Sequence, residues 1–82
     1  MIIDYQPRGV CSRRMTLEVE EGVIRSIRIQ GGCDGNLHGI SRLVEGMEVS
    51  EAIRRLDGIR CGGKPTSCPD QLAQALKQYK GE

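Results

Sequence analysis

Four cysteines are the residues of this chain whose chemistry is most distinctive. They are Cys11, Cys33, Cys61 and Cys68, separated by 21, 27 and 6 residues, so that no C-x-x-C pair occurs. Each is expected in a loop or at an element boundary, whereas a core cysteine lies more often within an element on its apolar face. Four thiolates that converge tetrahedrally suit zinc or an iron–sulfur centre. The pattern therefore predicts a metal site with these four side chains as ligands.

The residues around the cysteines favour the thiolate form. Cys33 lies just before an expected helix, and Cys68 is expected at the N-cap of another, where backbone N–H groups and the helix dipole favour negative charge. Thr66 and Ser67 can add hydrogen bonds. Four cationic residues flank the cysteines and would offset the negative charge of a four-thiolate site: Arg13, Arg14, Arg60 and Lys64.

Other uses of the thiols remain open from spacing alone. The four cysteines could form two disulfides or stay unlinked, and Cys61 and Cys68 could exchange as a redox pair. The first residues show no signal-peptide pattern, and no apolar stretch is long enough to span a membrane. We therefore expect a cytoplasmic protein, and in that compartment cysteines are more often metal ligands or redox groups than disulfides.

Length and composition predict a single small domain over residues 1–82 with a sparse core. Phe and Trp are absent, and Tyr5 and Tyr79 are the only aromatic residues. Domains of this size often need a disulfide, a metal or a partner for stability. The net charge of +1 argues against a nucleic-acid-binding domain, which usually carries a basic stripe.

The first part of the chain predicts an antiparallel sheet. Residues 1–5 suit an edge strand that ends before Pro7. Apolar and polar residues alternate from Met15 to residue 20 and again over residues 23–30, with the turn Glu21-Gly22 between them. This pattern predicts a β-hairpin.

Three helices are predicted after the sheet. The first has an apolar face and ends at Gly46; the second has Ser50 as its N-cap and ends at Gly58; the third has Pro69 at its first position. The expected inner faces comprise Leu37, Ile40, Leu43 and Val44, then Ala52, Ile53 and Leu56, then Leu72, Ala75, Leu76 and Tyr79. Strands followed by helices predict an α+β fold, with about three helices packed on a small antiparallel sheet of about three strands.

Little in the sequence indicates catalysis. Residues 58–65 approach the phosphate-loop pattern, but Pro65 replaces its Ser/Thr and no strand is expected before it. His38 is the only histidine and is expected to be solvated at the start of a helix. The acids Asp34, Glu45 and Asp70 are explained by capping and solubility.

The segments "YQPRGVCSR", "GGCDGN", "LVEGM" and "GIRCGGKPTSCPDQLAQAL" resemble the TSCPD-domain family of small four-cysteine proteins. All four cysteines fall in these motifs. The domain also occurs at the C-terminus of some ribonucleotide reductases. The resemblance implies an accessory module that acts through a protein partner, a ribonucleotide reductase, rather than a ribonucleoside-diphosphate reductase acting alone.

Residues 10–80 are also similar to iron–sulfur scaffold proteins of the NifU N-terminal type, which implies a similar fold and cluster ligands at Cys11, Cys33 and Cys68. Those scaffolds carry an aspartate where this chain has Arg13 and a histidine where it has Ser67, and they lack Cys61. An all-sulfur, closed tetrahedral site is typical of structural zinc. We therefore expect zinc on Cys11, Cys33, Cys61 and Cys68, with an iron–sulfur scaffold or carrier and a dithiol redox shuttle as the alternatives.

Overall fold

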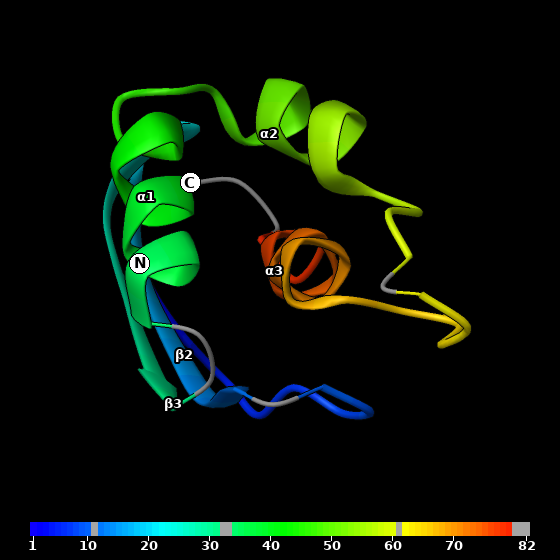
Figure 1. Ribbon diagram of the computed structural model, residues 1–82. Coiled ribbons are helices and arrows are strands. Elements are labelled where there is room, and N and C mark those ends of the chain that lie inside the picture. Colours follow the sequence, from blue (N-terminus) through cyan, green and yellow to red (C-terminus); the bar gives the residue numbers. More distant parts are fainter. Residues whose placement is uncertain (11, 32–33, 61, 80–82) are drawn as a thin grey trace.

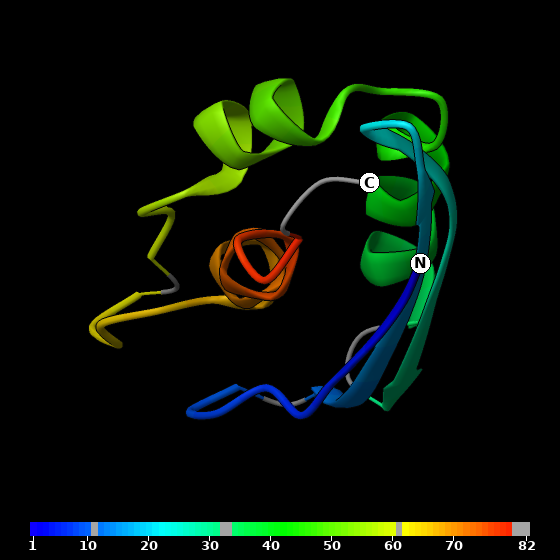
Figure 2. The same cartoon turned by 180° about the vertical axis from the view of Figure 1, so that it is seen from behind.

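The computed structural model describes residues 1–10, 12–31, 34–60 and 62–79, and for residues 34–36 the backbone alone. Three strands form one antiparallel sheet, and three helices follow them in the chain. All three helices lie on the same side of the sheet, as the two opposite views show (Figures 1 and 2). The predicted α+β architecture is confirmed.

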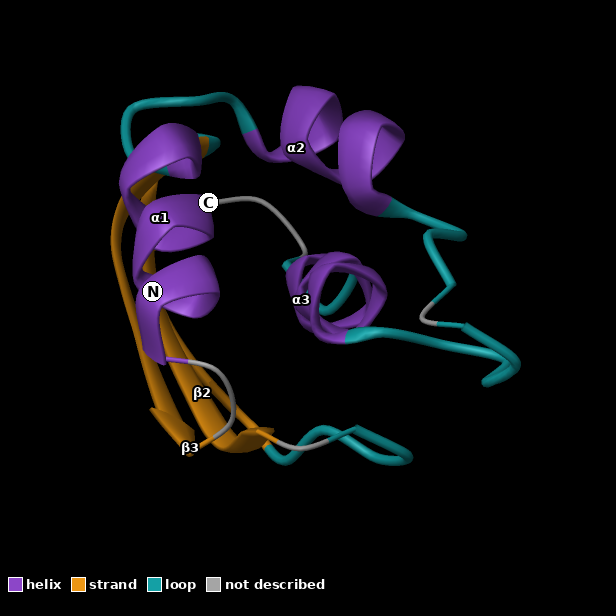
Figure 3. Ribbon diagram, viewed as in Figure 1, coloured by secondary structure: helices purple, strands orange, loops and turns teal. Residues whose placement is uncertain are grey.

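The sheet has the strand order β1-β2-β3, with β1 at Ile2–Tyr5, β2 at Ser12–Glu20 and β3 at Val23–Gly31 (Figure 3). The turn between β2 and β3 has Glu21 at φ 52° and Gly22 at φ 77°. Two successive residues with positive φ are the geometry of a tight hairpin whose twist matches that of the strands. The predicted hairpin is therefore confirmed, but β2 begins three residues before Met15.

Two irregularities in the pairing of β2 and β3 decide which side chains face the helices. The register passes from Ser12–Gly31 to Arg14–Gln30, so that Arg13 has no opposite residue. Such a bulge shifts the alternation by one residue. Ser12 is consequently buried on the same side as Met15, which a regular strand would not allow.

A second bulge at Arg25 has the same effect further along β3. The register passes from Glu18–Ser26 to Val19–Ile24, so that Arg25 has no opposite residue. Ile24 and Ile27 are therefore both buried although they are three positions apart.

The helices are α1 at Asp34–Val44, α2 at Val49–Leu56 and α3 at Cys68–Leu76. α1 packs on β3, while α3 contacts β1 and β2 and is itself packed against α2. In Figure 1, α3 is seen almost end-on, below α2 and to the right of α1. In the described ranges, every helix is too short or too polar to cross a membrane.

The core lies between the sheet and α3. Its largest completely buried side chains are Met15, Leu17, Val19, Ile24, Leu72 and Leu76. Tyr79, just beyond α3, packs against this core, and its hydroxyl oxygen accepts a hydrogen bond from the Gly22 N–H at 2.8 Å. The C-terminal end of α3 is therefore fastened to the β2–β3 turn. The predicted inner face of α3 is confirmed.

The predicted inner face of α1 was wrong at one position. Leu43 is 76% exposed, whereas Ser41 is buried, and its hydroxyl donates to the carbonyl of Leu37 at 2.9 Å. A serine that bonds the carbonyl four residues earlier carries no unsatisfied group into the core. The buried stripe is therefore narrower than the apolar residues of the sequence suggest.

The start of α2 also differs from the prediction. Ser50 lies inside the helix and is exposed, and the N-cap is Glu48, whose side chain makes no capping hydrogen bond. The backbone supplies the contact instead: the Val49 N–H donates to the carbonyl of Gly22 at 2.9 Å, and Val23 bridges to Glu48. Tertiary contact with the hairpin thus fixes the helix start that Ser50 was predicted to fix.

Truncation of two leucines tests this packing. Leu72→Ala removes a completely buried side chain from the centre of α3 and is expected to reduce the free energy of unfolding by about 2–5 kcal/mol. The matched variant Leu43→Ala, on the exposed face of α1, is expected to change it by less than about 0.5 kcal/mol. Urea denaturation followed by circular dichroism measures both. Equal losses would contradict this arrangement of the helices.

Candidate functional site

Cys68 is the one predicted metal ligand among the described residues; Cys11, Cys33 and Cys61 lie outside them. Cys68 is the first residue of α3 and is partly buried. Its Sγ lies 3.3 Å from the Oγ of Ser12, which is only 3% exposed. The thiol therefore lies at the N-terminus of a helix and beside a buried hydroxyl of β2.

The N-cap of α3 is Ser67, not Cys68 as predicted. The Ser67 Oγ accepts a hydrogen bond from the Asp70 N–H at 3.2 Å and donates one to the carbonyl of Ile59 at 2.6 Å. Pro69 is the second residue of the helix rather than the first, and its missing N–H removes a donor that would have no partner there. Cys68 consequently belongs to the first turn, where the helix dipole favours a thiolate.

Asp70 is a buried hydrogen-bonding centre, although the sequence suggested an ordinary boundary acid. It is 7% exposed and accepts hydrogen bonds from the Thr66 hydroxyl, the Gly58 N–H and the Gln74 amide. The Thr66 hydrogen bond first, and then the Gly58 one, hold the pKa of this carboxyl below its ordinary value. The spacing S-x-x-D was the available signal, since it is typical of a helix N-terminus.

Gln71 connects the same end of α3 to the chain that follows β1. Its Oε1 accepts from the Tyr5 hydroxyl at 3.1 Å and from the Arg8 N–H at 3.0 Å, and its Nε2 donates to Thr66 Oγ1 at 3.0 Å. Gln71 is 9% exposed. Sequence reasoning missed this residue because a glutamine inside a helix gives no local signal of long-range partners.

These contacts gather the described neighbours of all four cysteines at the start of α3. Ser12 follows Cys11 in the chain, contacts Cys68 and pairs with Gly31, which precedes Cys33 by two residues. Ile59 precedes Cys61 by two residues and accepts the hydrogen bond of Ser67. Consecutive Cα atoms are about 3.8 Å apart, so a separation of one or two residues keeps each of these cysteines close to its described neighbour.

The sequence was compared with models of protein families. The model of the TSCPD domain matches residues 3–80. The chain belongs to the TSCPD-domain family. Comparisons with curated proteins and with solved structures gave no match, so the similarity to NifU-type scaffolds stays a prediction.

The five residues that spell the name of the domain, Thr66 to Asp70, are those that build the start of α3. In this TSCPD domain the Thr and the Ser bond to the Asp, through its carboxylate and its backbone N–H respectively. The ranges that the structure describes contain one of the four cysteines, and within them no three His, Cys, Asp or Glu side chains are grouped to hold a metal ion.

The cations expected to flank the cysteines differ in their positions. Arg14 forms an exposed ion pair with Asp4 on β1, which lowers the pKa of that aspartate through the hydrogen bond between them. Arg13 lies against Gly31, where an added Cβ would be 3.1 Å from Nε of the arginine. Gly31 also has φ 80°, so a larger residue would be strained there as well as crowded. Arg60 and Lys64 are exposed.

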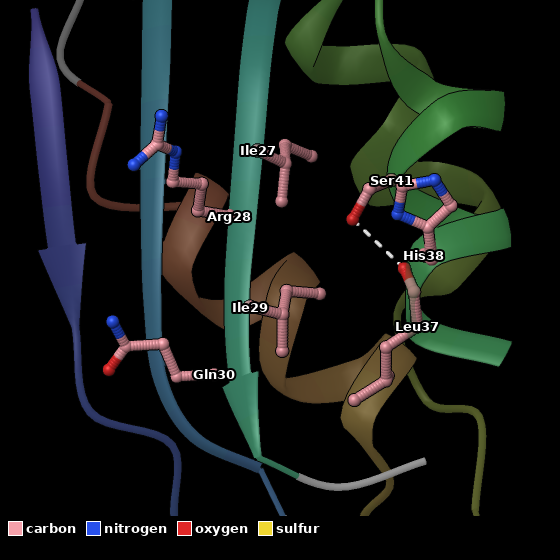
Figure 4. A pocket seen from close by; sticks show the side chains of 7 residues that line it. All are labelled: Ile27, Arg28, Ile29, Gln30, Leu37, His38 and Ser41. Carbon is pink, nitrogen blue, oxygen red and sulfur yellow. Dashed lines mark hydrogen bonds between the residues drawn. The ribbon is translucent and has the colours of Figure 1, made fainter. Parts of the chain in front are cut away.

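The other residues considered for chemistry have structural explanations. His38 is exposed, as predicted, and lies on the rim of a groove between α1 and β3 (Figure 4). The element before Gly58 is the helix α2, so the strand that a phosphate loop requires is not there.

Two serine substitutions test whether Ser67 holds the start of α3. Ser67→Ala removes the capping acceptor and leaves the Ile59 carbonyl without its donor, so we expect a loss of about 0.5–2 kcal/mol in the free energy of unfolding. Ser50→Ala is the matched control, because this exposed serine caps nothing, and its effect is expected to stay within about 0.5 kcal/mol. Chemical denaturation measures the two differences. A larger loss for Ser50→Ala would contradict the assignment of the caps.

Proposed function

We propose that this TSCPD domain is a metal-binding accessory module whose zinc is held by Cys11, Cys33, Cys61 and Cys68. The observation that carries the proposal is the meeting of Ser12, Gly31, Ile59 and Cys68 at the start of α3. Each of the other three cysteines stands within two residues, along the chain, of one member of this group.

The chemistry around Cys68 suits a thiolate ligand. The Ser12 hydroxyl can donate to its sulfur, and the first turn of α3 adds the positive end of the helix dipole. Hydrogen bonds of this kind orient metal ligands and tune the metal. Four thiolates fill a tetrahedral zinc site and leave no position for a substrate, so the bound zinc would supply stability rather than catalysis.

A structural metal also suits the composition of the domain. The core contains no Phe or Trp, and both tyrosines bond through their hydroxyls at opposite ends of α3. Ligands that assemble only in the folded state convert metal-binding free energy into folding free energy. Zinc at the start of α3 would therefore hold the loops that lead into that helix.

Membership of the TSCPD family supports a link to ribonucleotide reductases, some of which carry this domain at their C-terminus. We infer that the partner of this chain is such a reductase, and that the domain acts in the cytoplasm, where thiols stay reduced.

A dithiol redox shuttle is the second candidate, and one hydrogen bond favours it. The bond from Ser67 Oγ to the Ile59 carbonyl closes the loop that leads from α2 to α3, near whose two ends Cys61 and Cys68 stand in the chain. Oxidation would join the two sulfurs and release two electrons and two protons to a disulfide acceptor, such as an oxidised reductase. Such a pair would cycle only while no metal holds the thiols.

Metal analysis with an absorption spectrum, on protein purified without oxygen, distinguishes these functions. We expect one zinc per chain in a colourless protein, and a loss of most of this zinc when any one of the four cysteines is changed to serine. His38→Ala is the control, because the only histidine of the chain is exposed and is expected to leave the zinc content unchanged.

Two other results would overturn the zinc proposal. Iron with visible charge-transfer absorption would make the domain an iron–sulfur carrier. A metal-free protein in which Cys61 and Cys68 form a reversible disulfide would make it a redox shuttle.

A further inference from the structure

A groove with a volume of about 610 Å³ lies between β3 and α1. Ile27 and Ile29 point from β3 toward α1, and Leu37 and Ser41 point back from α1 (Figure 4). The groove therefore has an apolar floor along the last strand of the sheet. It involves none of the residues at the start of α3 that carry the proposed zinc site.

The edge of β3 beside this groove offers backbone groups to a further strand. β3 is the last strand of the sheet, and Ile24 bonds with both its N–H and its C=O to the loop between α1 and α2. From Arg25 to Gly31, no described residue bonds to this edge from outside the sheet. An exposed row of N–H and C=O groups can pair with an extended peptide.

Both elements that form the groove carry exposed arginines. Arg25 and Arg28 are exposed on β3, and Arg42 is exposed on α1, one turn after His38 on the groove rim. None of the three arginines forms an ion pair with another described residue. Glu18 of β2 shares the outer face of the sheet with Arg28 but is not bonded to it. The edge is therefore basic, with charges that a partner could neutralise.

We propose that the β3 edge binds an extended, acidic segment of a partner protein as a fourth strand. Successive side chains of a strand point to opposite faces, so one set would face the apolar floor and the other would lie beside Arg28 on the outer face. The bound segment therefore alternates apolar residues with Asp or Glu. About seven residues span the edge from Arg25 to Gly31.

The charge of the edge disfavours a second copy of this chain as the occupant. Antiparallel pairing of β3 with β3 of another molecule would bring two copies of Arg28 together on the outer face of the sheet. Like charges opposite each other in a sheet are destabilising, whereas opposite charges stabilise. The same arginine therefore discourages self-pairing and selects an acidic strand.

The test is an NMR titration of the whole ¹⁵N-labelled domain with two peptides. One alternates Glu with Val over seven residues, and the other has Lys in place of each Glu; both have blocked ends. We expect the acidic peptide to shift the amide signals of Ile27–Gln30 and Leu37–Ser41, and to bind about tenfold or more tightly than the basic one. Added salt should weaken the acidic complex.

Arg28→Glu is expected to reverse the preference, so that the basic peptide binds more tightly. Arg8→Glu is the matched control, because this exposed arginine lies beyond β1 at the other side of the sheet and makes the same change in net charge. Circular dichroism and zinc content should match the unaltered protein in both variants. Equal binding of the two peptides, no shift in either segment, or concentration-dependent shifts of β3 without peptide would each overturn the proposal.

Discussion

The start of α3 is where four of the five buried polar side chains in the described ranges find hydrogen-bond partners: Ser12, Ser67, Asp70 and Gln71. Ser67, Asp70 and Gln71 are each at most 9% exposed, and their side chains form hydrogen bonds with other groups of the chain. A buried polar group without a partner would destabilise the domain by about 1–3 kcal/mol. The ends of β1 and α2 are therefore held where their backbone groups meet this helix terminus.

The sheet reaches the same point through an irregularity. The bulge at Arg13 turns Ser12 inward. Gly31 lies opposite Ser12, where φ is positive and a Cβ would be crowded by Arg13. Without the bulge, Ser12 would lie on the outer face of the sheet, opposite to the side of Met15. The bulge thus extends β2 to the residue that touches Cys68 and lies next to Cys11 in the chain.

The elements were predictable because their signals are local, whereas the site depends on partners distant in sequence. Alternation from Met15 and the turn at Glu21-Gly22 predicted the hairpin, and Leu72 and Leu76 predicted the buried face of α3. The bulge at Arg13 gave no signal, since Ser12, Arg13 and Arg14 are all polar. The N-caps of α2 and α3 were misassigned because contacts distant in sequence also decide where these helices begin.

A hydroxyl near a helix start is a common cap, but tertiary contact decides which one serves. At the start of α2, contact with the hairpin backbone replaces the cap predicted at Ser50. At the start of α3, Ser67 is the N-cap, and its hydroxyl also donates to the Ile59 carbonyl. Gln71 looked ordinary because its partners Tyr5 and Arg8 lie 66 and 63 residues away in the chain. Asp70 looked ordinary because its hydrogen bond from the Gly58 N–H spans 12 residues. The four cysteines were predicted as ligands from residue type and placement, and all four lie within residues 3–80, which the family model matches.

X-ray absorption at the zinc edge of the purified domain tests the central claim most directly. A closed site of Cys11, Cys33, Cys61 and Cys68 predicts a single shell of four sulfur atoms at about 2.3 Å from the metal. A shell that contains nitrogen or oxygen, or fewer than four sulfurs, would contradict the proposal that the four thiols converge at the start of α3.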